Sequence, residues 1–120
     1  MENKCTPKKI KVLITIVDRG KGIKVTELLN KENIIYNLIS LATGTAKSEI
    51  LDYLGLGRTE KDLVISIIHE DNVKNIMNQL KEKMQLKEPG NGIAFTIPIS
   101  SVDSSLSLEY ICSILEGKKE

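Results

Sequence analysis

The hydrophobic pattern of the chain changes its period from two residues to about 3.6 residues and back again, and it does so twice. The segments in which apolar residues alternate, as they do in strands, are residues 9–17, 33–42, 61–70 and 93–99. The segments in which apolar residues recur at helical spacing are residues 22–32 and 73–84. The order is therefore strand, helix, strand, strand, helix, strand, and right-handed crossover connections restrict it to few topologies.

This order predicts an α+β fold of the ferredoxin-like type. It is a βαββαβ sandwich with a four-stranded antiparallel sheet, both helices on one face, and a long loop between strands 2 and 3. Pro98 lacks a backbone N–H donor, so the last strand should lie at a sheet edge. The other sheet face is expected to carry Leu38, Val64 and Ile68, and an aliphatic face of this kind needs cover.

The C-terminal extension, about residues 103–120, predicts a short helix capped by its serines, which could supply that cover; another subunit is the alternative. Cys112 lies on the apolar stripe of this helix and is expected as a small buried hydrophobic residue. Because Cys5 and Cys112 form neither a metal-ligand spacing nor a CxxC motif, we expect a reduced, cytoplasmic protein. The 120 residues fit one domain, spanning 1–120.

Composition argues against several classes of partner. The net charge is +1 and aromatic residues make up 3% of the chain, so neither a basic surface nor the base-stacking aromatics of an RRM-type domain are present. No apolar run approaches the roughly 20 residues that cross a bilayer, and the first residues lack the apolar core of a signal peptide. We therefore expect no nucleic-acid partner and no direct membrane insertion.

Residues 43–60 form a segment longer than most connections in compact domains. Ser48 can cap a short helix over residues 48–54, from which Leu51 and Leu54 could anchor to a core or to a partner chain. Four carboxylates in or beside this segment match no metal-ligand motif and are expected to form a solvated loop face: Glu49, Asp52, Glu60 and Asp62.

Two glycine-bearing segments, residues 43–45 and 89–92, should approach each other at one end of the predicted sheet. Glycine lets a backbone come close to a ligand, and successive backbone N–H groups can hold a phosphate. The side chains that could add donors or positive charge there are Thr45, Lys47, Lys61 and Lys87. The alternative is a pair of ordinary turns, because no Walker or GxGxxG sequence is present.

Nothing in the sequence supplies a catalytic constellation. His69 is the only histidine, no nucleophile–base pair is apparent, and no metal site is predicted. We therefore expect a protein that is not an enzyme and requires no cofactor. The alternative is a small acylphosphatase-like enzyme, which needs an arginine at a phosphate loop and could use only Arg19 or Arg58.

Taken together, residues 8–102 resemble the P-II family of nitrogen-signalling proteins. The run from Gly44 to Gly57 occupies the place of that family's T-loop, and residues 89–95 resemble its B-loop and the following strand. The resemblance implies a homotrimer that binds adenine nucleotides (ATP or ADP), and in many members 2-oxoglutarate, in clefts between subunits. It also implies control of a target of nitrogen metabolism, an ammonium transporter or a metabolic enzyme, through the T-loop.

Carried over by position, Gly44 and Thr45 lie at the base of the T-loop, while Gly90, Asn91 and Gly92 line the phosphates. With the lysines named above, the expected ligand-binding set is Gly44, Thr45, Lys61, Lys87, Gly90, Asn91 and Gly92. The expected partner-binding residues of the loop are Ser48, Glu49, Leu51, Tyr53, Leu54 and Arg58.

The chain also departs from the family pattern. Ile93 stands where the B-loop usually carries a lysine, and residues 100–103 replace the basic residues expected after the fourth strand. Tyr53 lacks the context of the tyrosine that is uridylylated in some members. These departures indicate a divergent member, and a P-II-like protein with a different ligand is the alternative.

Overall fold

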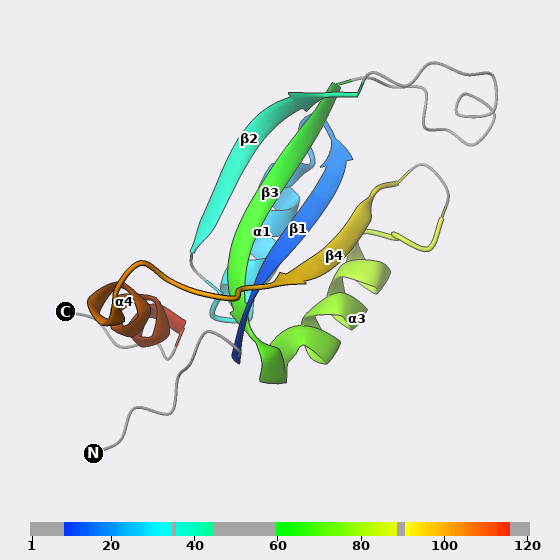
Figure 1. Ribbon diagram of the computed structural model, residues 1–120. Helices are drawn as coiled ribbons and strands as arrows, with labels where there is room; N and C mark the ends of the chain where they lie inside the picture. Colours follow the sequence, from blue (N-terminus) through cyan, green and yellow to red (C-terminus); the bar gives the residue numbers. More distant parts are fainter. Residues whose placement is uncertain (1–8, 35, 45–59, 89–90, 116–120) are drawn as a thin grey trace.

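The computed structural model of the chain describes residues 9–34, 36–44, 60–88 and 91–115 (Figure 1). Its strands are β1 (Ile10–Asp18), β2 (Asn37–Thr43), β3 (Glu60–His69) and β4 (Ile93–Pro98). Its helices are α1 (Gly22–Lys31), α3 (Val73–Lys83) and α4 (Ser105–Leu115), with a short 3-10 helix η2 (Glu70–Asn72) before α3. The predicted order of strands and helices is confirmed.

The four strands form one antiparallel sheet in the order β2-β3-β1-β4. Helices α1 and α3 lie together on one face of it, where α1 contacts β1 and β3 and α3 contacts β4 (Figure 1). The ferredoxin-like fold is therefore confirmed. Strand β4 lies at a sheet edge and ends at Pro98, as the missing donor of proline predicts.

The hydrophobic core lies between the sheet and these two helices. Its buried members are Leu13, Val17, Val25, Leu29, Ile34, Val64, Ile68, Ile76 and Leu80. Both predicted helical stripes supply it, α1 through Val25 and Leu29, and α3 through Ile76 and Leu80. Burying one such side chain contributes roughly 1.5–3 kcal/mol, so this layer accounts for much of the stability of the fold.

The sheet face turned away from α1 and α3, here called the open face, differs from the prediction. Val64 and Ile68 do not lie on it; they are buried beneath the helices. Val64 pairs with buried Thr15, whereas Ile65 pairs with Ile14 on the open face. Because β3 is aliphatic on both faces, its alternation alone did not determine which set faced the helices.

The apolar side chains that share the open face by register include Val12, Ile14, Ile16, Leu38, Leu63, Ile65, Ile93, Phe95 and Ile97, together with Ile10 and Ile67 at one end. Four of them are large and exposed, with exposed fractions of 56% for Leu38, 55% for Ile93, 38% for Phe95 and 45% for Ile97. An apolar patch of this extent is typical of an interaction surface.

Helix α4 covers one end of the open face, as expected for the C-terminal extension. Ile10 and Cys112 are buried there, and Ile67 and Leu108 pack against them. The predicted serine cap is present, since the Ser107 N–H donates to Ser104 Oγ at 3.1 Å.

The burial expected for Cys112 is confirmed, but the expected free thiol is wrong, because Cys112 is disulfide-bonded. The other cysteine of the chain, Cys5, lies outside the described residues.

The second strand begins later than predicted because α1 ends in a Schellman motif. Asn33 adopts a left-handed conformation with φ 68°, its N–H bonds to Asn30 O, and the N–H of Ile34 bonds to Leu29 O at 2.9 Å. This turn returns Ile34 to the core, so the strand starts only at Asn37.

Asp71 lies just before α3, but its side chain does not cap that helix. Instead the Asp71 N–H donates to His69 Nδ1 at 3.1 Å, and the 3-10 turn η2 leads into the helix. His69 therefore has a structural role as the side chain that begins this turn. Among the described helices, none is long and apolar enough to span a membrane.

Candidate functional site

The two glycine-bearing segments lead into the same end of the sheet. Strand β2 ends beside the start of β3, with Thr43 paired with Glu60, and β4 begins at Ile93, which pairs with Ile16 near the end of β1 (Figure 1). Strand β1 separates β3 from β4. Measured across the strands, the starts of β3 and β4 are therefore separated by two strand spacings, roughly 10 Å.

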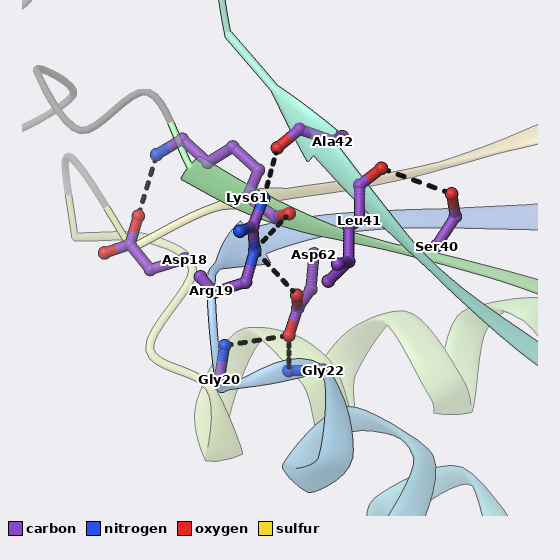
Figure 2. A network of polar contacts seen from close by, with 9 residues as sticks. All are labelled: Asp18, Arg19, Gly20, Gly22, Ser40, Leu41, Ala42, Lys61 and Asp62. Atoms are coloured by element: carbon purple, nitrogen blue, oxygen red, sulfur yellow. Dashed lines mark hydrogen bonds and ion pairs between the residues drawn. The ribbon is translucent and has the colours of Figure 1, made fainter.

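A buried carboxylate organises this end of the sheet. Asp62 is 5% exposed and faces the helices, and its Oδ2 accepts hydrogen bonds from the N–H groups of Gly20 at 2.9 Å and Gly22 at 3.0 Å (Figure 2). Gly22 is the first residue of α1, whose flanking residue Lys21 provides no side-chain cap. Asp62 therefore caps α1 from a different strand, and its negative charge lies at the positive end of the helix dipole.

Arg19 connects this carboxylate to the ends of two other strands. Its Nε lies 3.5 Å from Asp62 Oδ1 and donates to Lys61 O at 3.2 Å, and its Nη2 donates to Ala42 O at 2.7 Å. Figure 2 shows the guanidinium between the end of β2 and the start of β3. Ala42 and Lys61 lie on the two sides of the long loop, so one side chain holds both.

On the opposite face of the sheet, Lys61 Nζ forms an ion pair of 2.7 Å with Asp18 Oδ1. The two residues are cross-strand partners, and their side chains are 16% and 18% exposed. The positive charge predicted at Lys61 for a ligand is thus balanced within the chain.

Sequence reasoning missed this cluster, here called the sheet-end network: Asp18, Arg19, Gly20, Gly22, Ala42, Lys61 and Asp62. Asp62 was predicted to lie on a solvated loop face. That prediction is wrong, because Asp62 is a buried residue of β3. The available signal was the Asp-Arg-Gly-Lys-Gly run after the first strand. A Cβ at Gly22 would lie 2.9 Å from Asp62 Oδ2, so the close approach of the carboxylate requires glycine there.

A cavity of about 250 Å³ lies between the end of α3 and the start of β4. It is lined by Met77, Asn78, Lys81, Leu86, Lys87, Gly92, Ile93 and Ala94. Its floor is largely apolar, it contains two lysines, and no carboxylate lines it. Lys87 and Gly92 belong to the predicted ligand-binding set, whereas Lys81 does not.

The turn beside this cavity, at Asn91 and Gly92, is conformationally restricted. Gly92 has φ 129°, and a Cβ there would lie 2.5 Å from Ile16 O. Asn91 Nδ2 donates to Gln85 O at 3.0 Å, and Asn91 does not line the cavity. Asn91 therefore shapes the turn through the backbone of Gln85.

The structure thus places the predicted ligand-binding residues in two groups on either side of β1. Gly44 and Lys61 lie at the β2–β3 side, and Lys87 and Gly92 line the cavity at the β4 side. Thr45 and Gly90 lie outside the described residues. So do all the predicted partner-binding residues: Ser48, Glu49, Leu51, Tyr53, Leu54 and Arg58.

The described residues contain no group of three or more His, Cys, Asp or Glu side chains that could hold a metal ion. Arg19, which an acylphosphatase-like site would need for a phosphate, donates to the carbonyls of Ala42 and Lys61. No contact of the described residues favours that enzymatic alternative.

No family model matches the sequence, and no curated protein matches it. Solved structures do match by fold. A PII protein of Arabidopsis thaliana bound to citrate is 22% identical, covers 84% of each chain and superposes with a TM-score of 0.62. A CPII protein of Thiomonas intermedia K12 bound to ADP, AMP and acetate is 16% identical, covers 72% of this chain and 82% of its own, and gives a TM-score of 0.56.

The divalent ion tolerance protein CutA1 of Ehrlichia chaffeensis is 13% identical, covers 92% of this chain and 98% of its own, and gives a TM-score of 0.65. At these identities the comparisons establish the fold. The chain has a PII-like fold, which CutA1 shares, as the resemblance in the sequence implied.

Proposed function

We propose that this chain, on its PII-like fold, is a non-enzymatic signalling regulator that senses a small anionic metabolite. The candidate ligands are an adenine nucleotide and a carboxylate of the 2-oxoglutarate type. Two structures of similar fold support this choice of chemistry, because one is bound to citrate and the other to ADP, AMP and acetate.

The observation that carries the proposal is the convergence of the glycine-bearing segments at one end of the sheet. On the β4 side, Lys81 and Lys87 give the cavity positive charge with no lining carboxylate, which favours an anion. Gly92 brings the backbone against that cavity, and Gly44 and Lys61 occupy the β2–β3 side. We assign Thr45, Gly90 and Asn91 to the same ligand-binding set.

We further propose that the protein is a homotrimer whose ligand clefts lie between subunits. The support is the open face. Because α4 covers only one end of it, Leu38, Ile93, Phe95 and Ile97 remain exposed. Pairing this face with other copies would bury the apolar surface that the chain itself leaves uncovered.

The output of the signal is assigned to residues 43–60, which leave the sheet beside the proposed ligand site. In this proposal Ser48, Glu49, Leu51, Tyr53, Leu54 and Arg58 contact a target protein of nitrogen metabolism, an ammonium transporter or a metabolic enzyme. The protein acts without a required cofactor, and the metabolite is an effector.

Calorimetric titration of the chain with ATP, ADP, AMP, citrate and 2-oxoglutarate tests the ligand. We expect binding of at least one of them and about tenfold weaker binding in Lys87→Gln, because one charged donor is lost. Lys74→Gln removes an exposed lysine of α3 outside the cavity and serves as the matched control. Absence of heat with all five compounds would rule out this ligand class.

Light scattering after gel filtration tests the assembly. The expected mass is three times the 13.3 kDa of one chain. A monomer at micromolar concentration would remove the intersubunit cleft, and with it the proposed location of the ligand.

A further inference from the structure

The long loop joins the sheet at the end of the β2–β3 ladder, one residue pair beyond Ala42 and Lys61. These two residues are called the loop roots below. The loop is covalently connected to the domain only through them and their neighbours. A group that binds the carbonyls of both roots therefore holds this end of the ladder closed.

Arg19 is such a group. Its Nη2 donates to Ala42 O at 2.7 Å and its Nε donates to Lys61 O at 3.2 Å. Its backbone N–H also donates to Glu60 O at 3.3 Å. The planar fork of the guanidinium suits this task, because it presents several donors in fixed directions and can bond two acceptors at once (Figure 2).

Asp62 holds the guanidinium in place and connects it to α1. One carboxylate oxygen lies 3.5 Å from Arg19 Nε, and the other accepts the N–H groups of Gly20 and Gly22. Asp62 is almost fully buried, so its hydrogen bonds are only weakly exposed to competition from water. The loop roots, the guanidinium, the carboxylate and the start of α1 thus form one continuous network.

We infer that Arg19 is the positioning residue of the long loop. It fixes both loop roots to the β1–α1 turn, so that changes in the loop stay between Thr43 and Glu60 and do not open the β2–β3 ladder. This inference rests on the proposed signalling role of the loop. Asp62 acts through Arg19 as its orienting partner.

If Arg19 served only to stabilise the fold, its loss should speed amide exchange throughout the domain. Its position argues for a local effect instead. Its side chain is 34% exposed and does not belong to the hydrophobic core. All of its described contacts lie at one end of the sheet. Loss of the guanidinium should therefore loosen the loop roots and leave the amides of α3 and of the β1–β4 ladder protected.

Hydrogen exchange of backbone amides, measured by NMR on the full chain without ligand, tests the inference. In Arg19→Gln we expect exchange about tenfold faster at residues 41–43 and 60–62, with unchanged rates in α3. Arg19→Lys should restore only part of the protection, since an ammonium cannot reproduce the fork. Lys24→Gln, which removes an exposed cation of α1, is the matched control and should change neither region.

Asp62→Asn provides a second measurement. The amide oxygen can still accept from Gly20 and Gly22, but the charge opposite Arg19 is lost, so the loop roots should loosen less than in Arg19→Gln. Equal acceleration of exchange in α3 and at the loop roots, or full rescue by Arg19→Lys, would overturn the inference. So would unfolding of both Arg19 variants, because Arg19 would then support the whole fold.

Addition of ADP as a probe separates this inference from the proposed function. ADP should change exchange at residues 41–43 and 60–62 less in the unmodified chain than in Arg19→Gln. If ADP does not bind the chain, the ligand half of the proposed function fails and the ligand-free measurements still decide the role of Arg19.

Discussion

The two faces of the sheet differ in what covers them and in how many polar side chains they bury. The face beneath α1 and α3 contains the buried polar side chains of the sheet, Thr15, Asp62 and Ser66, alongside its aliphatic residues. Two of these have partners inside the chain, since Asp62 bonds the β1–α1 turn and Ser66 Oγ donates to Asn37 Oδ1 at 2.6 Å. Where the chain covers itself, it can match individual polar groups.

The open face carries mostly aliphatic and aromatic side chains, with the Asp18–Lys61 ion pair at one end, and much of it remains exposed. Apolar surface is non-directional and accepts any close-fitting apolar partner, including a second copy of itself. The comparison indicates that the helix-covered face determines the fold of one chain, while the open face is the surface through which we propose that chains associate.

The largest expected effect is on assembly. Leu38→Lys combined with Phe95→Lys should raise the dissociation constant of the assembly at least about 100-fold, because ammonium groups would have to be buried in an apolar interface. Both positions are exposed in the single chain, so its fold should persist. Sedimentation velocity measures the change. Ile23→Lys, at a position 56% exposed on α1, is the control, and an unchanged assembly in the double variant would contradict the distinction between the faces.

Truncation of the core should have the next largest effect. Leu13→Ala, on the helix-covered face, should lower the free energy of unfolding by about 2–5 kcal/mol, since it leaves a cavity in a fully buried site. Ile93→Ala, on the open face, should cost less than about 1 kcal/mol when both changes are made in the dissociated double variant. Urea unfolding followed by circular dichroism compares them, because the chain has no tryptophan. Equal losses would remove the energetic difference between the faces.

A smaller loss is expected at the helix cap. Gly22→Ala places a methyl group 2.9 Å from Asp62 Oδ2 and should destabilise the fold by about 1–3 kcal/mol, as overpacking of a tight site does. Lys21→Ala, at the neighbouring exposed position, should change the stability little. Thermal unfolding measures both, and a neutral Gly22→Ala would show that the carboxylate can move away from α1 without cost.

The smallest expected change is a gain in stability. Thr15 Oγ1 is buried and has no hydrogen-bond partner among the described residues. Thr15→Val removes this hydroxyl at nearly constant volume and should stabilise the fold by about 1 kcal/mol. Ser66→Ala, which breaks the bond to Asn37, should destabilise it by a similar amount. Both shifts are measurable by urea unfolding, and a loss of stability in Thr15→Val would indicate a partner for the hydroxyl.

The fold could be predicted from the sequence where one periodicity dominated. The helical stripes of α1 and α3 and the alternation of β1 were sufficient to give the order, the sheet and the packing of both helices on one face. Prediction failed in β3, where the side chains on both faces of the strand are apolar. Alternation could not show there which set faces the helices, and Val64 and Ile68 were assigned to the wrong face. It also failed at Asn33, whose left-handed conformation depends on the hydrogen bonds that close α1.

The candidate site was predictable only in part, for a different physical reason. Glycine and lysine are recognisable from local chemistry, which is why the sequence offered Lys87 and Gly92, both of which line the cavity, as candidates. Asp62, however, acts through N–H groups forty and more positions earlier in the chain. Its burial depends on the arrangement of three strands and a helix, and no local pattern encodes it.

The position of β4 also has a consequence for the time course of assembly. Strand β1 lies in the centre of the sheet, yet one of its partners is the last strand to be synthesised. Three of the four large exposed apolar residues of the open face, Ile93, Phe95 and Ile97, belong to that last strand. A nascent chain therefore does not present the complete open face until its own sheet has closed. If this face is the association surface, as we propose, chains that are still folding lack the surface through which finished chains recognise each other.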